Sequence, residues 1–220
     1  MQLLAVTKDE SVMISILSLF ASSVKTDDGR SITIQRIHRT FDVLLHNDAA
    51  FMLVALLKHS STTVQERTFQ IIGIILSNGN ETHIQLILDA NVLPIMRSLL
   101  LLPNESIRGK TCLALSNIMV EPNNIEKAIA ADLFPLLLHL INVPHSSVSL
   151  EVQKEVGCAI RNAIVYGNTQ QVYYLVGQGV IKLLCDLLSC SHLQFVIVAL
   201  EGKSLQLWSQ ENEIVSVLCL

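Results

Sequence analysis

Charged and aromatic residues are both scarce in this chain. Only 15% of its 220 residues are charged and 5% are aromatic, with a single tryptophan. The net charge of −4 and the pI near 5.9 argue against a protein that binds nucleic acid. Half of the residues are hydrophobic, yet no apolar run reaches the roughly 18 residues that a membrane span needs. The composition therefore favours a protein whose apolar residues are buried against one another.

The motifs of several chemical functions are also missing. The five cysteines follow no repeating framework, which is typical of a protein kept in a reducing compartment. The seven histidines show no metal-ligand spacing. No nucleophile, base and orienting group recur together. We therefore expect no catalytic activity, no metal and no cofactor.

Strand signals are nearly absent, and polar breaks divide the chain into helical units. Each unit is predicted to contain a short helix, a second helix and a longer third helix. The predicted triplets are 83–90, 93–101 and 107–120, then 125–131, 134–141 and 150–166, then 171–177, 181–189 and 193–209. Units of about 40 to 47 residues with three helices are typical of armadillo repeats.

We therefore expect an all-α fold, one right-handed superhelical solenoid of armadillo repeats. The predicted bounds are a partial repeat at 1–30, repeats at 31–80, 81–121, 122–168 and 169–210, and a tail at 211–220. With these bounds the chain begins and ends in the middle of a solenoid, without polar capping repeats.

One pattern recurs in the third helices. Its apolar positions keep the same order and spacing in three of them: Val64, Thr68, Ile71, Ile72 and Ile75; Ile107, Thr111, Ala114, Leu115 and Ile118; Val152, Val156, Ala159, Ile160 and Ala163. Asn117 and Asn162 hold one further position, on a different face from the apolar stripe, where Ile74 stands in the earliest of the three. Asparagines at one position of successive repeats would form a ladder of amides along a groove.

Residues 110–208 contain phrases that resemble the importin-α (karyopherin-α) family. These are Cys112-Leu-Ala-Leu-Ser-Asn117-Ile, Glu155-Val-Gly-Cys-Ala-Ile-Arg-Asn162-Ala, and the segment from Tyr174 to Leu188. The resemblance is to the later part of the family's repeat array. It implies a nuclear import adaptor that binds extended basic nuclear localisation signals in a concave groove.

The resemblance also implies partners and a location. The expected partners are proteins that carry nuclear localisation signals, with importin-β added only if a basic segment exists outside this chain. Neither nucleic acid nor a membrane is expected as a partner. The implied location is the cytoplasm and the nucleus.

Three residues match the peptide-binding positions of the family. Asn117 and Asn162 would hold the backbone of the peptide, because an amide side chain both donates and accepts hydrogen bonds. Glu155 would pair with a lysine or an arginine of the peptide. Ser116, beside Asn117, belongs to the same expected peptide-binding set.

Other positions depart from the family pattern. Leu113 and Cys158 stand where the family has tryptophans, and each lost indole removes roughly 0.5 to 2 kcal/mol of cation–π attraction. Lys110 reverses the charge of an acidic groove position, and Arg67 shares its register. The expected peptide-binding residues thus include Leu113, Cys158 and Lys110, with weakened recognition of basic signals.

Other interpretations stay open. The missing tryptophans and Lys110 favour an armadillo interaction scaffold that has lost signal binding. The shared register of Lys110 and Arg67 is compatible with a binder of acidic peptides and with a solvated surface. A fragment or splice form of a longer carrier would explain both abrupt ends.

Overall fold

The computed structural model describes residues 14–15, 17–18, 38–43, 45, 48–143 and 148–183. Within these ranges every regular element is helical. No helix in this part of the chain is long and apolar enough to cross a membrane. The predicted helix 193–209 and the predicted tail 211–220 lie outside the described residues.

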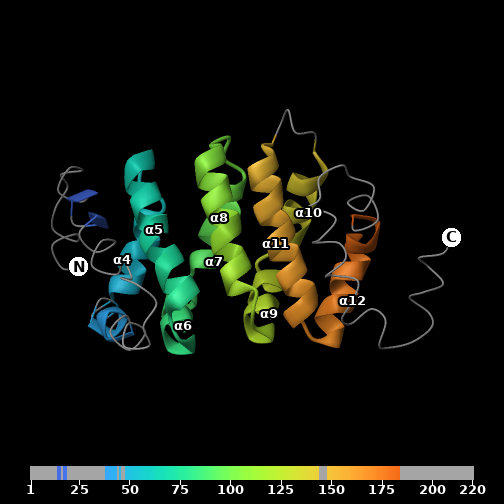
Figure 1. Ribbon diagram of the computed structural model, residues 1–220, viewed down its shortest axis with the longest axis horizontal. Coiled ribbons are helices and arrows are strands. Elements are labelled where there is room, and N and C mark those ends of the chain that lie inside the picture. Colours follow the sequence, from blue (N-terminus) through green and yellow to red (C-terminus); the bar gives the residue numbers. More distant parts are fainter. Residues whose placement is uncertain are drawn as a thin grey trace, which may run out of the picture. The chain divides into compact units, whose positions relative to one another are not determined.

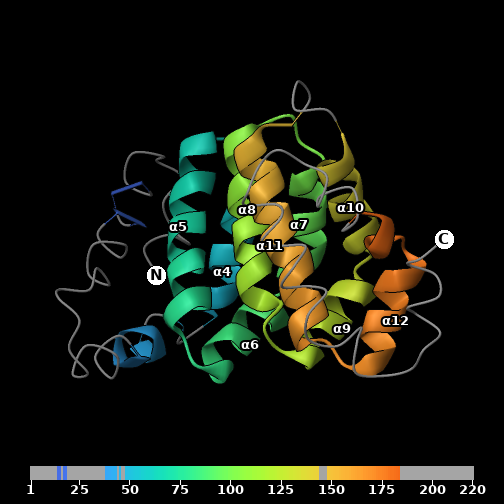
Figure 2. The ribbon, with the colours of Figure 1, turned by 45° about the vertical axis from the view of Figure 1, so that its right-hand side comes forward.

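The chain divides into two compact units, Met1–Asn117 and Ile118–Leu220. Labelled helices of the first unit are α4 (Ala49–Leu56), α5 (Thr62–Asn78), α6 (Glu81–Asp89), α7 (Val92–Leu100) and α8 (Glu105–Ile118, whose last residue already belongs to the second unit). Within this unit α6 packs against α4, α5 and α7. The long helices α5 and α8 lie side by side in both ribbon views (Figures 1 and 2).

Labelled helices of the second unit are α9 (Pro122–Ala130), α10 (Phe134–Asn142), α11 (Leu150–Tyr166) and α12 (Thr169–Gly177). The long helix α11 packs against α9, α10 and α12 (Figure 1). From α6 to α12 the observed ends differ from the predicted ones by at most three residues, so the all-α armadillo prediction is confirmed at the level of its helices. Of the predicted helix 181–189, residues 181–183 are helical and the rest lies outside the described residues.

The apolar pattern of the third helices forms the core of both units. All fifteen positions of the three predicted stripes are buried in α5, α8 and α11. Two of these positions hold threonines, Thr68 and Thr111. Each hydroxyl donates to the carbonyl oxygen four residues earlier, at 2.7 Å, and this bond allows the threonine to be buried. The stripe can therefore include a threonine without leaving an unpaired polar group in the core.

The turns between first and second helices share one backbone feature. Each contains a residue with a positive φ angle: 63° at Asn91, 54° at Asp132 and 90° at Gly179. Asn, Asp and Gly tolerate this left-handed region better than other residues do. The same turn therefore recurs in three successive predicted repeats.

The third helices α5 and α11 both end at a glycine. The amide N–H of Gly79 donates to the Ile75 carbonyl oxygen at 2.7 Å, and that of Gly167 donates to the Ala163 carbonyl oxygen at 3.0 Å. A Cβ atom at either glycine would collide with the same carbonyl oxygen. These two positions therefore need glycine for the close approach of the backbone.

Two first helices begin with a capping box. At α6 the Asn80 side chain accepts from the His83 backbone N–H, and His83 Nδ1 accepts from the Asn80 backbone N–H at 3.2 Å. At α12 Asn168 and Gln171 exchange the same pair of bonds, both at 3.0 Å. Each box satisfies backbone donors that the first turn of a helix leaves open.

The last residue of each box, three positions after the N-cap, also reaches back to the preceding predicted repeat. His83 Nε2 lies 2.8 Å from Asp42 Oδ1, and it carries the ring proton because Nδ1 is an acceptor. Gln171 Nε2 donates to the Pro122 carbonyl oxygen at 2.9 Å and to Glu126 Oε2 at 3.1 Å. Both side chains are buried, so they connect the start of one repeat to the repeat before it.

Candidate functional site

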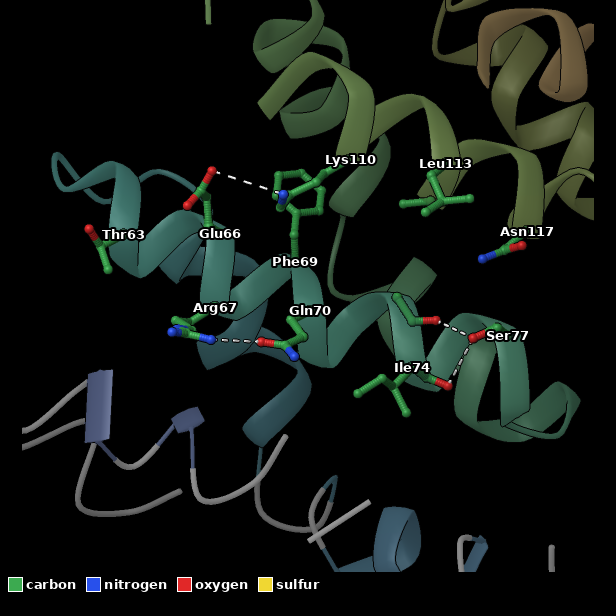
Figure 3. Close-up of a pocket in the computed structure, with 12 residues that line it drawn as sticks. Thr63, Glu66, Arg67, Phe69, Gln70, Ile74, Ser77, Lys110, Leu113 and Asn117 are labelled. Atoms are coloured by element: carbon green, nitrogen blue, oxygen red, sulfur yellow. Dashed lines mark hydrogen bonds and ion pairs between the residues drawn. The ribbon is translucent and has the colours of Figure 1, made fainter. Parts of the chain in front are cut away.

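A pocket of about 720 Å³ lies between α5 and α8 in the first unit (Figure 3). Both walls come from third helices, the elements that the repeat pattern predicts to line a groove. The lining residues are Thr63, Glu66, Arg67, Phe69, Gln70, Gly73, Ile74, Ser77, Lys110, Leu113, Ala114 and Asn117. The structure thus brings three predicted site residues, Lys110, Leu113 and Asn117, to one wall of a pocket.

The two walls face each other with matched positions. Adding 43 to the number of an α5 residue gives its equivalent on α8, because the apolar stripes of the two helices are offset by that number. Six lining residues form three such pairs: Arg67 with Lys110, Gln70 with Leu113, and Ile74 with Asn117. The pocket therefore has a cationic end, a middle with one amide and one apolar side chain, and an end that carries the asparagine.

The Asn117 side chain points toward the pocket and is partly exposed (Figure 3). Within the described part of the chain, no hydrogen bond involves its amide group. The neighbouring Leu113 is 46% exposed, one helical turn before Asn117 on the same wall. The pocket thus offers an open amide donor and acceptor next to an exposed apolar side chain.

A network of polar contacts occupies the cationic end. Lys110 Nζ lies 3.9 Å from Glu66 Oε1 and donates to Ser106 Oγ at 3.3 Å, while the Ser106 hydroxyl donates to Glu66 Oε1. Arg67 Nη1 donates to the neutral Gln70 side chain at 3.2 Å. Among the described residues no carboxylate lies within ion-pair distance of Arg67. Since Glu66 is the one carboxylate among the described residues of the pocket wall, this part of the lining carries a net positive charge.

Ser116 does not line the pocket. Its side chain is only 5% exposed, and its hydroxyl donates to the Leu113 carbonyl oxygen at 2.8 Å. Consecutive residues of an α-helix differ by about 100° in direction, so the neighbour of a groove residue turns away from the groove. The expectation that Ser116 contacts a peptide together with Asn117 is therefore not supported by its position.

In the second unit, α11 carries Glu155, Cys158 and Asn162 at the same register as Lys110, Leu113 and Asn117 on α8. All three α11 side chains are partly exposed. The Asn162 amide differs from that of Asn117, because its oxygen accepts a hydrogen bond from Arg161 Nη1 at 3.0 Å. A ligand at Asn162 would have to share this oxygen with Arg161 or displace it.

Burial raises the pKa of the Glu155 carboxyl above its usual value, the positive charge of Lys154 opposes the rise, and Glu151 adds to it. Glu155 therefore holds its proton more tightly than an exposed glutamate does. A cationic ligand beside it would favour the ionised form and lower this pKa.

Sequence reasoning did not identify the Glu66, Ser106 and Lys110 contacts. They join residues about 40 positions apart, on the walls of neighbouring repeats. The repeat offset pairs Lys110 with Arg67 and gives no signal for Glu66, which is one residue away from that position. In the described residues no group of three or more metal-ligating side chains occurs.

The chain is similar in sequence to importin-α subunits of two plants. Importin subunit alpha-5 of Arabidopsis thaliana is 35% identical over 97 residues, which cover 44% of this chain. Importin subunit alpha-1b of Oryza sativa subsp. japonica is 36% identical over 152 residues, or 68% of this chain. This chain is an importin-α-like armadillo-repeat protein. The matched segments amount to 18% and 28% of the two relatives' lengths, so the importin-α-like chain spans less than a third of either relative.

Solved structures confirm the fold of this importin-α-like chain. A designed armadillo repeat protein matches with a TM-score of 0.81 at 23% identity, over 98% of this chain and 84% of that one. A second designed armadillo repeat protein, solved in complex with the peptide (KR)4, matches with a TM-score of 0.74 at 24% identity, over 92% of this chain and 86% of that one. No family model matches the chain.

Proposed function

We propose that this chain is an adaptor of the importin-α type that binds an extended peptide across its third helices, with weakened recognition of basic nuclear localisation signals. The observation that carries the proposal is the open Asn117 amide on the wall of the α5–α8 pocket. An amide can donate to a peptide carbonyl and accept from a peptide N–H without selecting side chains. Backbone recognition of this kind fits an extended segment.

The residues around the two asparagines support weakened binding of basic peptides. Leu113 and Cys158 offer no aromatic face, so the cation–π attraction of about 0.5 to 2 kcal/mol per aromatic ring is absent. Lys110 would repel a lysine or arginine of the peptide, and the carboxylate of Glu66 already contacts Lys110 and Ser106. On α11, Glu155 is available for a basic side chain.

Fluorescence anisotropy with a labelled basic signal peptide tests the proposal. Asn117→Ala should weaken binding by about two- to tenfold, the value of one hydrogen bond of roughly 0.5 to 1.5 kcal/mol. Asn162→Ala should have a smaller effect, because Arg161 already occupies its oxygen. The matched control is Asn123→Ala, which removes an exposed asparagine of α9. Unchanged affinity in the double variant of Asn117 and Asn162 would contradict the proposal.

A second candidate function is an armadillo interaction scaffold that has lost signal binding. Lys110 on the pocket wall, with its contact to Glu66, favours this alternative. In that case the basic peptide should not bind even at millimolar concentration. Recovery of binding in a Lys110→Glu variant with tryptophans at positions 113 and 158 would then show that only the signal site had been lost.

The proposal includes partners, location and repeat bounds. The partners would be proteins with nuclear localisation signals, met in the cytoplasm and the nucleus, and importin-β would join only through a basic segment outside this chain. The role would be binding and not catalysis. The repeats would run 31–80, 81–121, 122–168 and 169–210 in one solenoid, which the recurring left-handed turns support.

A further inference from the structure

We propose that the α5–α8 pocket selects a peptide segment with an acidic side chain, and not a basic one. This inference rests on the proposed function, because it assumes that Asn117 holds the backbone of an extended peptide. It adds the class of side chain that this part of the groove accepts, and it assigns the choice to Arg67 and Lys110.

The charge of the pocket wall favours an acidic side chain. Its described residues include two cations and one carboxylate, and the carboxylate of Glu66 already accepts from the Ser106 hydroxyl and lies 3.9 Å from Lys110 Nζ. Arg67 contributes a charge that no described carboxylate balances, since Nη1 bonds to the neutral Gln70. A carboxylate from a ligand would supply the missing negative charge, whereas a lysine would add a third cation.

The order of the three residue pairs along the helices also fits a glutamate side chain. Asn117 and Lys110 are seven residues apart on α8, or about 10 Å along the helix axis. If the peptide backbone is bound at the Ile74–Asn117 pair, a glutamate side chain of the peptide can extend across the Gln70–Leu113 pair. Its carboxylate would then meet the long side chains of the Arg67–Lys110 pair, while its methylene groups would contact the exposed Leu113.

Both cations hold one register position. Arg67 on α5 and Lys110 on α8 are equivalent residues of neighbouring repeats, so both walls offer a cation at the same level. Their equivalent on α11, in the other unit, is Glu155. Among the third helices that the structure describes, preference for an acidic side chain is therefore a property of the α5–α8 pair, and α11 keeps its preference for a basic one.

The test uses the full chain and three labelled peptides of one length that alternate leucine with a variable residue. The variable residue is glutamate, glutamine or lysine. We expect the glutamate peptide to bind about two- to fivefold more tightly than the glutamine peptide, and the lysine peptide to bind more weakly than either. Added salt should weaken binding of the glutamate peptide most, because exposed charges are screened.

Variants of Arg67 and Lys110 test whether these two side chains cause the preference for glutamate. Arg67→Gln and Lys110→Gln should each reduce the advantage of the glutamate peptide over the glutamine peptide, and the double variant should abolish it. Lys58→Gln is the matched control, because Lys58 is an exposed cation of the same unit outside the pocket. The exposed side chain of Arg67 makes Arg67→Gln a variant that keeps the fold, which far-ultraviolet circular dichroism checks.

The outcomes separate this inference from the proposed function. Equal binding of the glutamate and glutamine peptides, or no binding of the glutamate peptide, overturns the inference. An advantage for glutamate that survives the double variant of Arg67 and Lys110 also overturns it. Asn117→Ala should weaken all three peptides by a similar factor. If it weakens none of them, the proposed function fails as well.

Discussion

Replacing Gln171 with alanine should lower the free energy of unfolding of the second unit by about 2 to 3 kcal/mol. The side chain is buried and makes three hydrogen bonds: it accepts from the Asn168 N–H and donates to the Pro122 carbonyl oxygen and to Glu126. A net value of about 1 kcal/mol per bond gives this range, with the bond to exposed Glu126 contributing least.

Urea denaturation followed by circular dichroism at the helix band measures the effect. The matched control is Gln170→Ala, the same change at an exposed residue of the same helix, which should stay within about 0.5 kcal/mol of the parent. Hydrogen exchange should also show that the α12 amides lose protection in Gln171→Ala before those of α10.

Gln171→His tests the role of these hydrogen bonds more specifically than Gln171→Ala does. In the first unit His83 performs both tasks of Gln171, since Nδ1 caps the helix and Nε2 reaches a carboxylate of the preceding repeat. Gln171→His should therefore retain more stability than Gln171→Ala. Equal losses in the two variants, or a loss in Gln171→Ala no larger than in Gln170→Ala, would refute the account of these links.

Three further predictions concern the core, a helix cap and a carboxyl group. Leu115→Ala should cost about 2 to 5 kcal/mol in urea denaturation because the side chain is fully buried, whereas Leu113→Ala on the same helix should cost far less. Ser149→Ala removes the N-cap of α11 and should cost about 1 kcal/mol in thermal unfolding; an unchanged melting temperature would count against the cap. Burial raises the pKa of Glu155, so the folded chain binds this proton more tightly than the unfolded chain, and stability should fall as pH rises from the usual value of 4.5 through the raised pKa. Glu155→Gln should remove this dependence of the free energy of unfolding on pH. An unchanged pH dependence would contradict the assignment of this effect to Glu155.

The long third helices were the most predictable part of the fold. The bounds of α11, Leu150 to Tyr166, agree with the prediction because apolar residues mark almost every turn and Ser149 and Gly167 mark the ends. The start of α8 was predicted two residues late, at Ile107. The structure begins this helix at Glu105, where the Asn104 side chain accepts from the Ile107 N–H at 3.1 Å, and a polar first turn carries no apolar period.

The candidate site was predictable only in part. Repeat spacing identified Asn117, and the resemblance to the importin-α family added Lys110 and Leu113; all three line the pocket. The same spacing could not show that Ser116 is buried or that Glu66 contacts Lys110, because these facts depend on side-chain direction and on the distance between neighbouring helices.

The links made by His83 and Gln171 were also missed. Their signal was present as asparagine followed three residues later by histidine or glutamine, which is the form of a capping box. The contacts with Asp42 and Glu126 join residues more than 40 positions apart, and only the packed helices bring them together.

The most direct test of the central claim is the side-chain amide signal of Asn117 in a proton–nitrogen correlation spectrum recorded during titration with an extended peptide. The account predicts that this signal shifts with peptide concentration while that of exposed Asn123 stays in place. Peptide binding that shifts signals elsewhere and leaves the Asn117 amide unchanged would contradict the claim that this pocket holds a peptide backbone.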